Sequence, residues 1–344
     1  MARNNGQRAP TMHAVARRAG VSQTTVSLVI NNVESASIPV ETRERVWAAV
    51  SALNYRPNMV ARTLRTQRSA LIGLISDEIA TTPYAGGIIE GTHDTTWAHD
   101  RILVVVNTKK NPDVEKAAIK TLLDHQVEGV IYAAMYHQPV KVPEVLRSVP
   151  AVLLNCYDET GAFDSVVSDE FSGARAATEL LLDKGHRRIG FINCNLPIPA
   201  TIGRLAGYQA ALSAHGIVLD ESLVVAEDNS AEGGVRGTRA LMCRESRPSG
   251  LFCFTDRVAM GAYSALGNLN LRIPEDVALI GFDNQEVIAA HLDPPLTTME
   301  LPHYEMGVWA VERLLQLLTT TTSSDAETPQ HHAIAPRLIV RASA

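Results

Sequence analysis

Residues 11–31 read TMHAVARRAGVSQTTVSLVIN, and this stretch predicts two short helices joined by a tight turn. Thr11 is a good N-cap for the first helix, because its hydroxyl can accept a hydrogen bond from a free backbone N–H. The apolar residues of that helix share one face: Val15, Ala16 and Ala19. Gly20 is expected to end the helix, since glycine adopts positive φ at low cost.

Ser22 is expected to cap a second helix. Its inner face is predicted to be Val26, Val29 and Ile30. The remaining side chains of its first turns point elsewhere: Gln23, Thr24, Thr25, Ser27 and Leu28. This arrangement is typical of a helix-turn-helix, whose second helix enters the DNA major groove. Glutamine can bond an adenine edge, and threonine can contact a thymine methyl. An alanine and a glycine at this spacing also occur in ordinary helical hairpins. The prediction therefore depends on the combination of two caps, small residues, a glycine turn and a polar outer face in one basic segment.

A third helix is predicted at about 40–53, with Val46, Ala49, Val50 and Leu53 facing inward. Residues 54–65 follow and read NYRPNMVARTLR. Pro57 can begin a helix here, being favoured at the first helical position. That helix would have fewer than two turns, too few for stability alone in water. We therefore expect it to form only with a partner, such as DNA and a second copy of itself.

The charge of the chain is unevenly distributed. Residues 1–66 contain nine Arg, no Lys and three Glu, a formal charge of +6, whereas the whole chain has −6. A basic head on an acidic body is typical of a nucleic-acid-binding module fused to another domain. A solvated basic tail is the alternative for the head.

From residue 70 onward, short apolar strands alternate with helices. The predicted strands are 71–75, 102–106, 129–133, 152–154, 189–193, 250–254 and 277–281. The predicted helices include 86–99, 113–126, 172–184 and 205–215. Such alternation indicates parallel sheets covered on both faces, which bind ligands beyond the carboxyl ends of their strands.

Several classes of function find no support in the sequence. No GxGxxG or GxxxxGK[ST] motif follows a strand, and GxSxG and HExxH are absent. His186 is interpreted as structural, and His331-His332 is a weak metal candidate in an expected loop. We predict no enzyme and no cofactor.

The cellular compartment is inferred from what the sequence lacks. The four cysteines form no CxxC pair, and Cys156, Cys194 and Cys253 lie in or beside apolar runs. Residues 1–10 do not resemble a secretory signal, and no apolar run is long enough to cross a membrane. We expect a cytoplasmic protein with reduced thiols and no membrane partner.

Together, TMHAVARRAGVSQTTVSLVIN and YRPNMVARTLRT resemble the lactose-repressor (LacI/GalR) family of transcription regulators. The resemblance implies a homodimeric repressor that binds double-stranded operator DNA. The DNA-contacting residues that it implies are Thr11, Ser22, Gln23, Thr24, Thr25, Ser27, Leu28, Asn31, Tyr55, Asn58, Ala61 and Leu64. Leu64 would wedge between base steps in the minor groove, although it could also be a plain linker residue.

Two positions depart from the pattern of the family. Ala14 stands where the family commonly has Asp, so reciprocal capping of the first helix is lost. Leu28 stands where the family often has Arg, and leucine cannot bond a guanine edge. The operator sequence therefore stays open.

Later motifs extend the resemblance through the chain: GHRRIGFI at 185–192, RLAGY at 204–208, GFD at 281–283, PPLTT at 294–298 and PRLIVR at 336–341. They imply an all-α helix-turn-helix head followed by a two-lobed, periplasmic-binding-protein-like α/β domain with doubly wound parallel sheets. The implied domains are a DNA-binding domain at 1–56, a hinge helix and linker at 57–69, and an effector-binding domain at 70–344.

The effector-binding domain is expected to consist of two lobes that the chain joins three times. The N-lobe is expected at about 70–168 and 301–323, and the C-lobe at about 171–297 and 329–344. The three crossings are accordingly placed near 168–171, 298–301 and 323–329.

The resemblance also places a small effector between the lobes. The implied contacts are Tyr84, Asn155, Arg204, Asn229, Thr255 and Asp283. Arg204 and Asp283 could hold vicinal hydroxyls as donor and acceptor, or could instead brace loops. Asn229 stands where some sugar-sensing members have an aromatic platform. A carbohydrate effector is the main hypothesis. A purine- or nucleoside-responsive regulator and a small-molecule receptor with a non-specific basic head are the alternatives.

Overall fold

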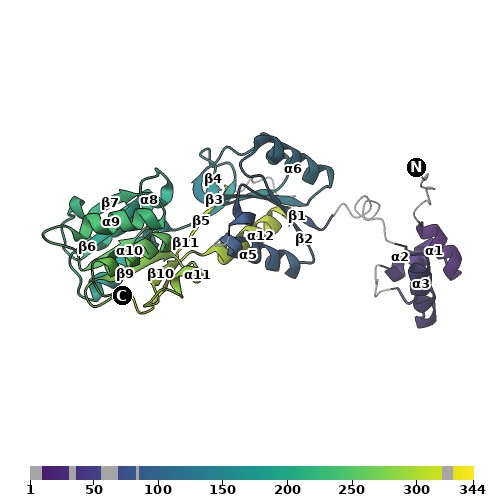
Figure 1. Ribbon diagram of the computed structural model, residues 1–344. Helices are drawn as coiled ribbons and strands as arrows, with labels where there is room; N and C mark the ends of the chain where they lie inside the picture. Colours follow the sequence, from purple (N-terminus) through teal and green to yellow (C-terminus); the bar gives the residue numbers. More distant parts are fainter. Residues whose placement is uncertain (1–9, 31–35, 56–68, 83–84, 320–327) are drawn as a thin grey trace, which may run out of the picture. The chain divides into compact units, whose positions relative to one another are not determined.

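The computed structural model describes residues 10–30, 36–55, 69–82, 85–319 and 328–344. The chain divides into two compact units, Met1–Ser69 and Ala70–Ala344. Each unit is described by itself (Figure 1).

The described residues of the first unit form three helices: α1 (Met12–Ala19), α2 (Gln23–Ile30) and α3 (Val40–Ala52). The ends of α1 and the start of α2 lie at the capping residues that the sequence predicts. The backbone N–H of Ala14 donates to Thr11 Oγ1 (3.3 Å), and Gly20 ends α1 with φ 66°. Ser22 Oγ accepts from the N–H of Thr25 (3.0 Å) and caps α2.

A small apolar core holds the three helices together. Its buried residues are Val15, Ala16, Ala19, Val26, Val29, Val46, Ala49 and Tyr55. Ile30, Val50 and Leu53 pack against this core but are only partly buried. The predicted helix-turn-helix and its third helix are therefore present.

In the second unit, the residues that the structure describes form two six-stranded sheets. The first has the order β11-β5-β4-β3-β1-β2, and all its strand pairs are parallel. Its strands are β1 (Leu71–Ser76), β2 (Ile102–Asn107), β3 (Gly129–Pro139), β4 (Ala151–Tyr157), β5 (Asp164–Ser168) and β11 (His331–Ile334). Its helices are α5 (Gly86–Ala98), α6 (Pro112–Asp124) and α12 (His303–Thr319). We call this half the N-lobe.

Alternating strand residues form an apolar core on each face of the N-lobe sheet. Ile72 and Leu74 pack with residues of α5 and α12, whereas Ile75 packs with residues of α6. Helices α5 and α12 are close-packed, because a Cβ on Gly91 would lie 2.1 Å from the carbonyl oxygen of Tyr304.

The second sheet has the order β12-β10-β9-β8-β6-β7, with β12 antiparallel to β10. Its strands are β6 (Ile189–Cys194), β7 (Val224–Glu227), β8 (Gly250–Cys253), β9 (Ala278–Asp283), β10 (Thr297–Glu300) and β12 (Arg337–Ile339). Its helices are α7 (Glu170–Asp183), α8 (Pro199–Ala214), α9 (Ala231–Met242), α10 (Asp256–Asn268) and α11 (Glu286–Ala289). We call this half the C-lobe.

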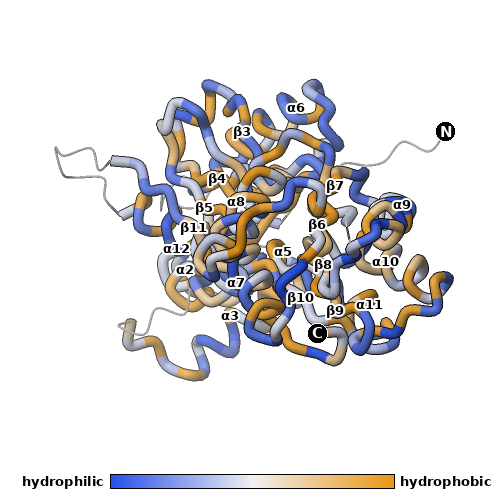
Figure 2. The backbone as a smooth tube through the Cα atoms, turned by 90° about the vertical axis from the view of Figure 1, so that its left-hand side faces the viewer, coloured by the Kyte–Doolittle hydropathy of each residue, from blue (hydrophilic) through white to orange (hydrophobic). Residues whose placement is uncertain are grey.

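The C-lobe sheet is also covered on both faces, by α7 and α8 on one side and by α9 and α10 on the other. Phe191 and Phe252 stack on neighbouring strands with their ring centroids 4.6 Å apart. In Figure 2 hydrophobic and hydrophilic segments alternate along the chain, and α6 and α9 carry hydrophilic stretches. Short 3-10 helices, η1 (Ile79–Thr81), η3 (Glu144–Ser148) and η4 (Glu221–Leu223), lie in the connections.

The chain passes between the lobes between β5 and α7, again between β10 and α12, and a third time between β11 and β12. The prediction of a third crossing near 323–329, with 329–344 in the C-lobe, was wrong. Residues 331–334 pair in parallel with β5 of the N-lobe, so the crossing lies after Ile334. Residues 319–324 read TTTTSS, and this composition favoured a crossover near 323–329, whereas the backbone pairing of β11 decides where the chain changes lobe. Among the described residues, no helix is long and apolar enough to cross a membrane.

Candidate functional site

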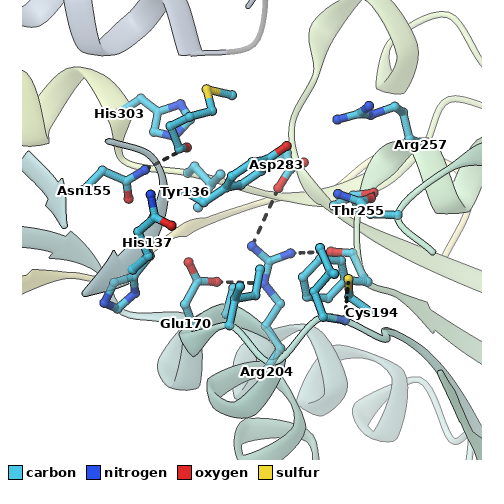
Figure 3. Close-up of a pocket in the computed structure, with 18 residues that line it drawn as sticks. Tyr136, His137, Asn155, Glu170, Cys194, Arg204, Thr255, Arg257, Asp283 and His303 are labelled. Carbon is cyan, nitrogen blue, oxygen red and sulfur yellow. Dashed lines mark hydrogen bonds and ion pairs between the residues drawn. The ribbon is translucent and has the colours of Figure 1, made fainter. Parts of the chain in front are cut away.

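A cavity of about 310 Å³ lies between the two lobes, at the carboxyl ends of several parallel strands. This is the position at which such sheets bind ligands. The N-lobe contributes Tyr136, His137 and Asn155, and the C-lobe contributes Arg204, Thr255 and Asp283 among others (Figure 3). The wall also has apolar residues: Met135, Leu196, Ile198, Ala200, Phe254 and Leu301.

Arg204 extends from α8 into the floor of this cavity and is 3% exposed. Its Nε donates to Glu170 Oε2 (2.7 Å), an Nη donates to the Phe254 carbonyl, and the other Nη lies 3.7 Å from Asp283 Oδ1. The guanidinium also lies against the rings of Phe282 and Phe254, 3.7 and 4.4 Å from their centroids. Arg204 thus joins α7, the residue that follows β8, and β9.

Asp283 ends β9 with a φ of 107°, a conformation that L residues rarely adopt. Its side chain is 5% exposed. Burial raises the pKa of this carboxyl to about 6, although Arg204 and the amide of Gln285 counteract the shift. A carboxylate that titrates near neutrality can accept hydrogen bonds from hydroxyls or, when protonated, donate one.

A second buried carboxyl, that of Asp256, holds the turn that follows Asp283. Asp256, at the start of α10, accepts a hydrogen bond from Thr298 Oγ1 (2.6 Å) and one from the backbone N–H of Gln285 (2.6 Å). Burial raises the pKa of Asp256 to about 8, with a further contribution from Asp283. Asp256 therefore holds the turn that follows Asp283.

Some polar groups of the cavity already form hydrogen bonds within the protein. Asn155 has φ 56°, and its Nδ2 donates to the carbonyls of Ala134 and Met135 (3.1 and 3.0 Å). Thr255 caps α10, and its hydroxyl lies 2.5 Å from Asn229 Oδ1. These bonds fix the orientation of the polar groups that face the cavity.

The structure brings five predicted effector residues to one cavity: Asn155, Arg204, Asn229, Thr255 and Asp283. Tyr84 lies outside the described residues. Sequence reasoning missed Glu170, His137 and Arg257, which also line the cavity. Glu170 lies within the lobe crossing predicted near 168–171, which could have suggested it, but nothing in the sequence marked His137 or Arg257.

In the helix-turn-helix, Thr11, Ser22, Gln23 and Thr24 are exposed, whereas Thr25, Ser27 and Leu28 are partly buried. Gln23 Nε2 lies 3.0 Å from His13 Nδ1, so α1 helps to orient a residue expected to read bases. Tyr55 is 7% exposed and belongs to the core of the head, a packing role that the sequence did not assign. Asn31, Asn58, Ala61 and Leu64 lie outside the described residues.

The other histidines of interest have structural contacts. His186 Nδ1 lies 2.9 Å from Ser249 Oγ. His331 and His332 lie in strand β11 rather than in a loop, where His331 contacts Ser165 and His332 stacks on Trp309. In the described part of the chain, no three His, Cys, Asp or Glu side chains are grouped so as to hold a metal ion.

A helix-turn-helix head joined to a two-lobed domain with a polar cavity defines a ligand-controlled DNA-binding regulator. Comparison with known proteins agrees. Residues 11–58 match the bacterial regulatory proteins of the lacI family, and residues 178–344 match the periplasmic binding protein-like domain. The HTH-type transcriptional repressor PurR of Erwinia tasmaniensis is 34% identical, over 97% of this chain and 96% of its own length.

Two solved structures are similar over nearly the whole chain. The Lac repressor dimer bound to operator and the anti-inducer ONPF is 28% identical, with a TM-score of 0.78 over 98% of this chain and 99% of its own. The transcriptional regulator CelR in complex with cellobiose is also 28% identical, with a TM-score of 0.64 over 97% of this chain and 100% of its own.

The chain belongs to the lacI family of bacterial regulatory proteins. It is a DNA-binding transcriptional repressor controlled by a small-molecule effector.

Proposed function

We propose that this repressor acts in the cytoplasm as a homodimer on a near-palindromic operator. Two-fold symmetry of the protein requires two DNA half-sites, one for each head. Gln23 and Thr24 are exposed at the N-terminus of α2, where they can reach base edges. The similarity to a Lac repressor dimer on its operator supports this assembly.

We further propose that the effector is a sugar, and the polar lining of the cavity is the observation that carries this proposal. Asn155, Asn229, Thr255 and Asp283 offer donors and acceptors suited to hydroxyl groups. The volume of about 310 Å³ lies at the lower end of the range for small-molecule sites. The similar CelR structure contains cellobiose, which supports a carbohydrate.

A purine or nucleoside would be expected to stack on an aromatic ring of the pocket. Phe254 is 3% exposed, and the Arg204 guanidinium already lies against its ring. Asn229, which stands where some sugar-sensing members of the family have an aromatic platform, has no ring on which a base could stack. Tyr136 also lines the cavity and is 38% exposed, so it is the ring on which a purine would stack. A purine is therefore the second candidate, and the sugar proposal depends on the polar lining.

Thermal-shift screening of neutral sugars, acidic sugars and purines against the full chain tests the class of effector. A ligand that binds only the folded state raises the melting temperature, by an amount set by its concentration relative to Kd. We expect a sugar to do so. A shift with purines and with no sugar would contradict the proposal.

Removing residues 1–66 tests the role of the head. We expect this variant to keep the thermal shift with the effector and to lose operator binding in an electrophoretic mobility assay. Operator binding by the shortened chain would instead favour a small-molecule receptor whose basic head is a tether.

The hinge sequence suggests how the effector alters DNA binding. We propose that residues 58–64, which lie outside the described residues, form a helix only on operator DNA. Hydrogen exchange should then slow across this segment when operator is added, and it should speed up again with an inducing effector. Equal exchange with and without operator would contradict this mechanism.

A further inference from the structure

We propose that the effector carries an anionic group, a carboxylate or a phosphate on a sugar skeleton, and that Arg257 binds that group. The inference rests on the proposed sugar effector and narrows its chemical class. It comes from the contacts in the cavity, where both carboxylates lie against Arg204 and the Nε of Arg257 has no hydrogen-bond partner among the described residues.

Arg257 lies in the first turn of α10, and its side chain lines the cavity on the C-lobe side (Figure 3). Its Nε is buried and has no hydrogen-bond partner among the described residues. No described carboxylate lies within 4 Å of its guanidinium, although the charge of Arg257 helps to lower the pKa of Asp283 from a longer distance. A buried guanidinium nitrogen without an acceptor is costly, so a ligand that supplies an acceptor gains affinity.

The carboxylates around the cavity, by contrast, have partners. Glu170 accepts from Arg204 Nε, and Asp283 accepts from Gln285 Nε2 (3.1 Å) and faces Arg204. Asp256 is held by Thr298 and by a backbone N–H, and burial raises its pKa to about 8, so it is mostly uncharged at pH 7. The described lining contains two arginines and two carboxylates, but both carboxylates lie against Arg204. Arg257 is therefore the charged group of this lining without a contact partner, which favours an anion over an ammonium group.

The second orphaned polar atom of the described lining lies on the opposite lobe. His137 Nδ1 is buried without a hydrogen-bond partner, and burial lowers the pKa of this ring, so the imidazole is neutral at pH 7. A neutral imidazole can pair with a hydroxyl group. The ligand thus presents its anionic end to Arg257 and a hydroxyl to His137, and this arrangement bridges the lobes.

The position of Arg257 suits an anion for a second reason. It follows the capping residue Thr255 by two positions, at the end of α10 where the helix dipole is positive. A planar guanidinium binds two oxygens of a carboxylate or a phosphate at once. Both anions offer this geometry, so the test must distinguish them.

The test is isothermal titration of the full chain with families of related sugars. Each five- or six-carbon neutral sugar is compared with its aldonate, its uronate, its terminal phosphate and its amino sugar. The wild type is compared with Arg257→Gln and with Arg239→Gln, the latter an exposed arginine of α9 outside the cavity. Arg257→Lys keeps the charge without the planar fork. Melting temperatures without ligand show that the variants fold.

We expect one acidic member to bind more tightly than its neutral parent. Arg257→Gln should weaken that acid about tenfold to hundredfold and leave the neutral parent within about threefold. Arg257→Lys should fall between, and Arg239→Gln should match the wild type. Tighter binding of a carboxylate or of a phosphate identifies which anion the site takes.

Three results would overturn the inference. A neutral or amino sugar that binds at least as tightly as every acid of its family refutes it and leaves the proposed sugar effector intact. If Arg257→Gln weakens the binding of the acidic sugar by less than about threefold, the proposed role of this residue is refuted. If purines bind and no sugar of any charge does, the proposed function fails and the inference fails with it.

Discussion

Replacing Arg204 by methionine tests whether this residue is a structural brace as well as a wall of the cavity. The substitution keeps an unbranched chain of similar length but removes the charge. It leaves the carboxylates of Glu170 and Asp283, 7% and 5% exposed, without their cation. It also removes the guanidinium from the rings of Phe282 and Phe254.

The expected loss follows from these contacts. Removing one partner of a buried ion pair costs about 3–5 kcal/mol, because an uncompensated charge stays buried. Arg204→Lys should recover only part of this, since an ammonium cannot match the planar contacts. The double variant Arg204→Met with Glu170→Gln should regain about 1–3 kcal/mol of unfolding free energy relative to Arg204→Met alone. The reason is that glutamine removes one of the two buried negative charges that Arg204→Met leaves without a cation.

Urea denaturation of the full chain without ligand, followed by tryptophan fluorescence and circular dichroism, measures these losses. Arg175→Met is the matched control, because Arg175 forms an exposed pair with Glu179 at 2.8 Å. That control should lose no more than about 1 kcal/mol. An unfolding free energy for Arg204→Met that falls by less than about 1 kcal/mol would refute the bracing role.

Three further predictions concern packing, pH and base recognition. Gly91→Ala should destabilise the N-lobe by about 1–3 kcal/mol or more in thermal denaturation, because the new Cβ would lie 2.1 Å from the carbonyl oxygen of Tyr304; an unchanged melting temperature would contradict the close packing of α5 on α12. The raised pKa of Asp256, about 8, means that its contribution to stability is present below pH 4 and is lost as the pH rises through 8; Asp256→Asn should flatten this pH dependence in denaturation curves, and an unaltered slope would argue against it. Gln23→Ala should relax operator preference at one base pair by about 1–3 kcal/mol in a selection assay, and His13→Ala should do so more weakly, because His13 only orients Gln23; an unchanged selected sequence would exclude both roles.

The sequence predicted the head well because its signals are local. Thr11, Gly20 and Ser22 each mark a helix end through a single side chain or a single φ, and the structure has all three. Tyr55 was harder, since its place in the core depends on how three helices pack rather than on its neighbours in the sequence.

In the two-lobed domain, local patterns predicted the strands but not how the last ones pair. The assignment of β11 to the N-lobe depends on backbone hydrogen bonds to β5, more than 160 positions earlier in the sequence. Helix α8 begins at Pro199, before its predicted start at 205, because Pro199 is favoured at the first position of a helix.

The candidate cavity was predicted only where the family resemblance named a residue. Arg204 and Asp283 were expected, and the structure brings them within 3.7 Å of each other. Glu170 and the rings that surround Arg204 come from other elements, and only the folded chain brings them together. The lack of a hydrogen-bond partner for the Nε of Arg257 likewise depends on the residues that the fold places around it, and the neighbouring sequence does not reveal it.

Operator affinity measured as a function of effector concentration tests the central claim most directly. The operator is first selected from random DNA with the full chain, and its affinity is then followed by fluorescence anisotropy at fixed salt. We predict that the sugar that raises the melting temperature also changes operator affinity by about tenfold or more, and that Asp283→Asn loses both effects while it keeps DNA binding without the sugar. Operator affinity that stays constant while the sugar saturates the cavity would contradict the account.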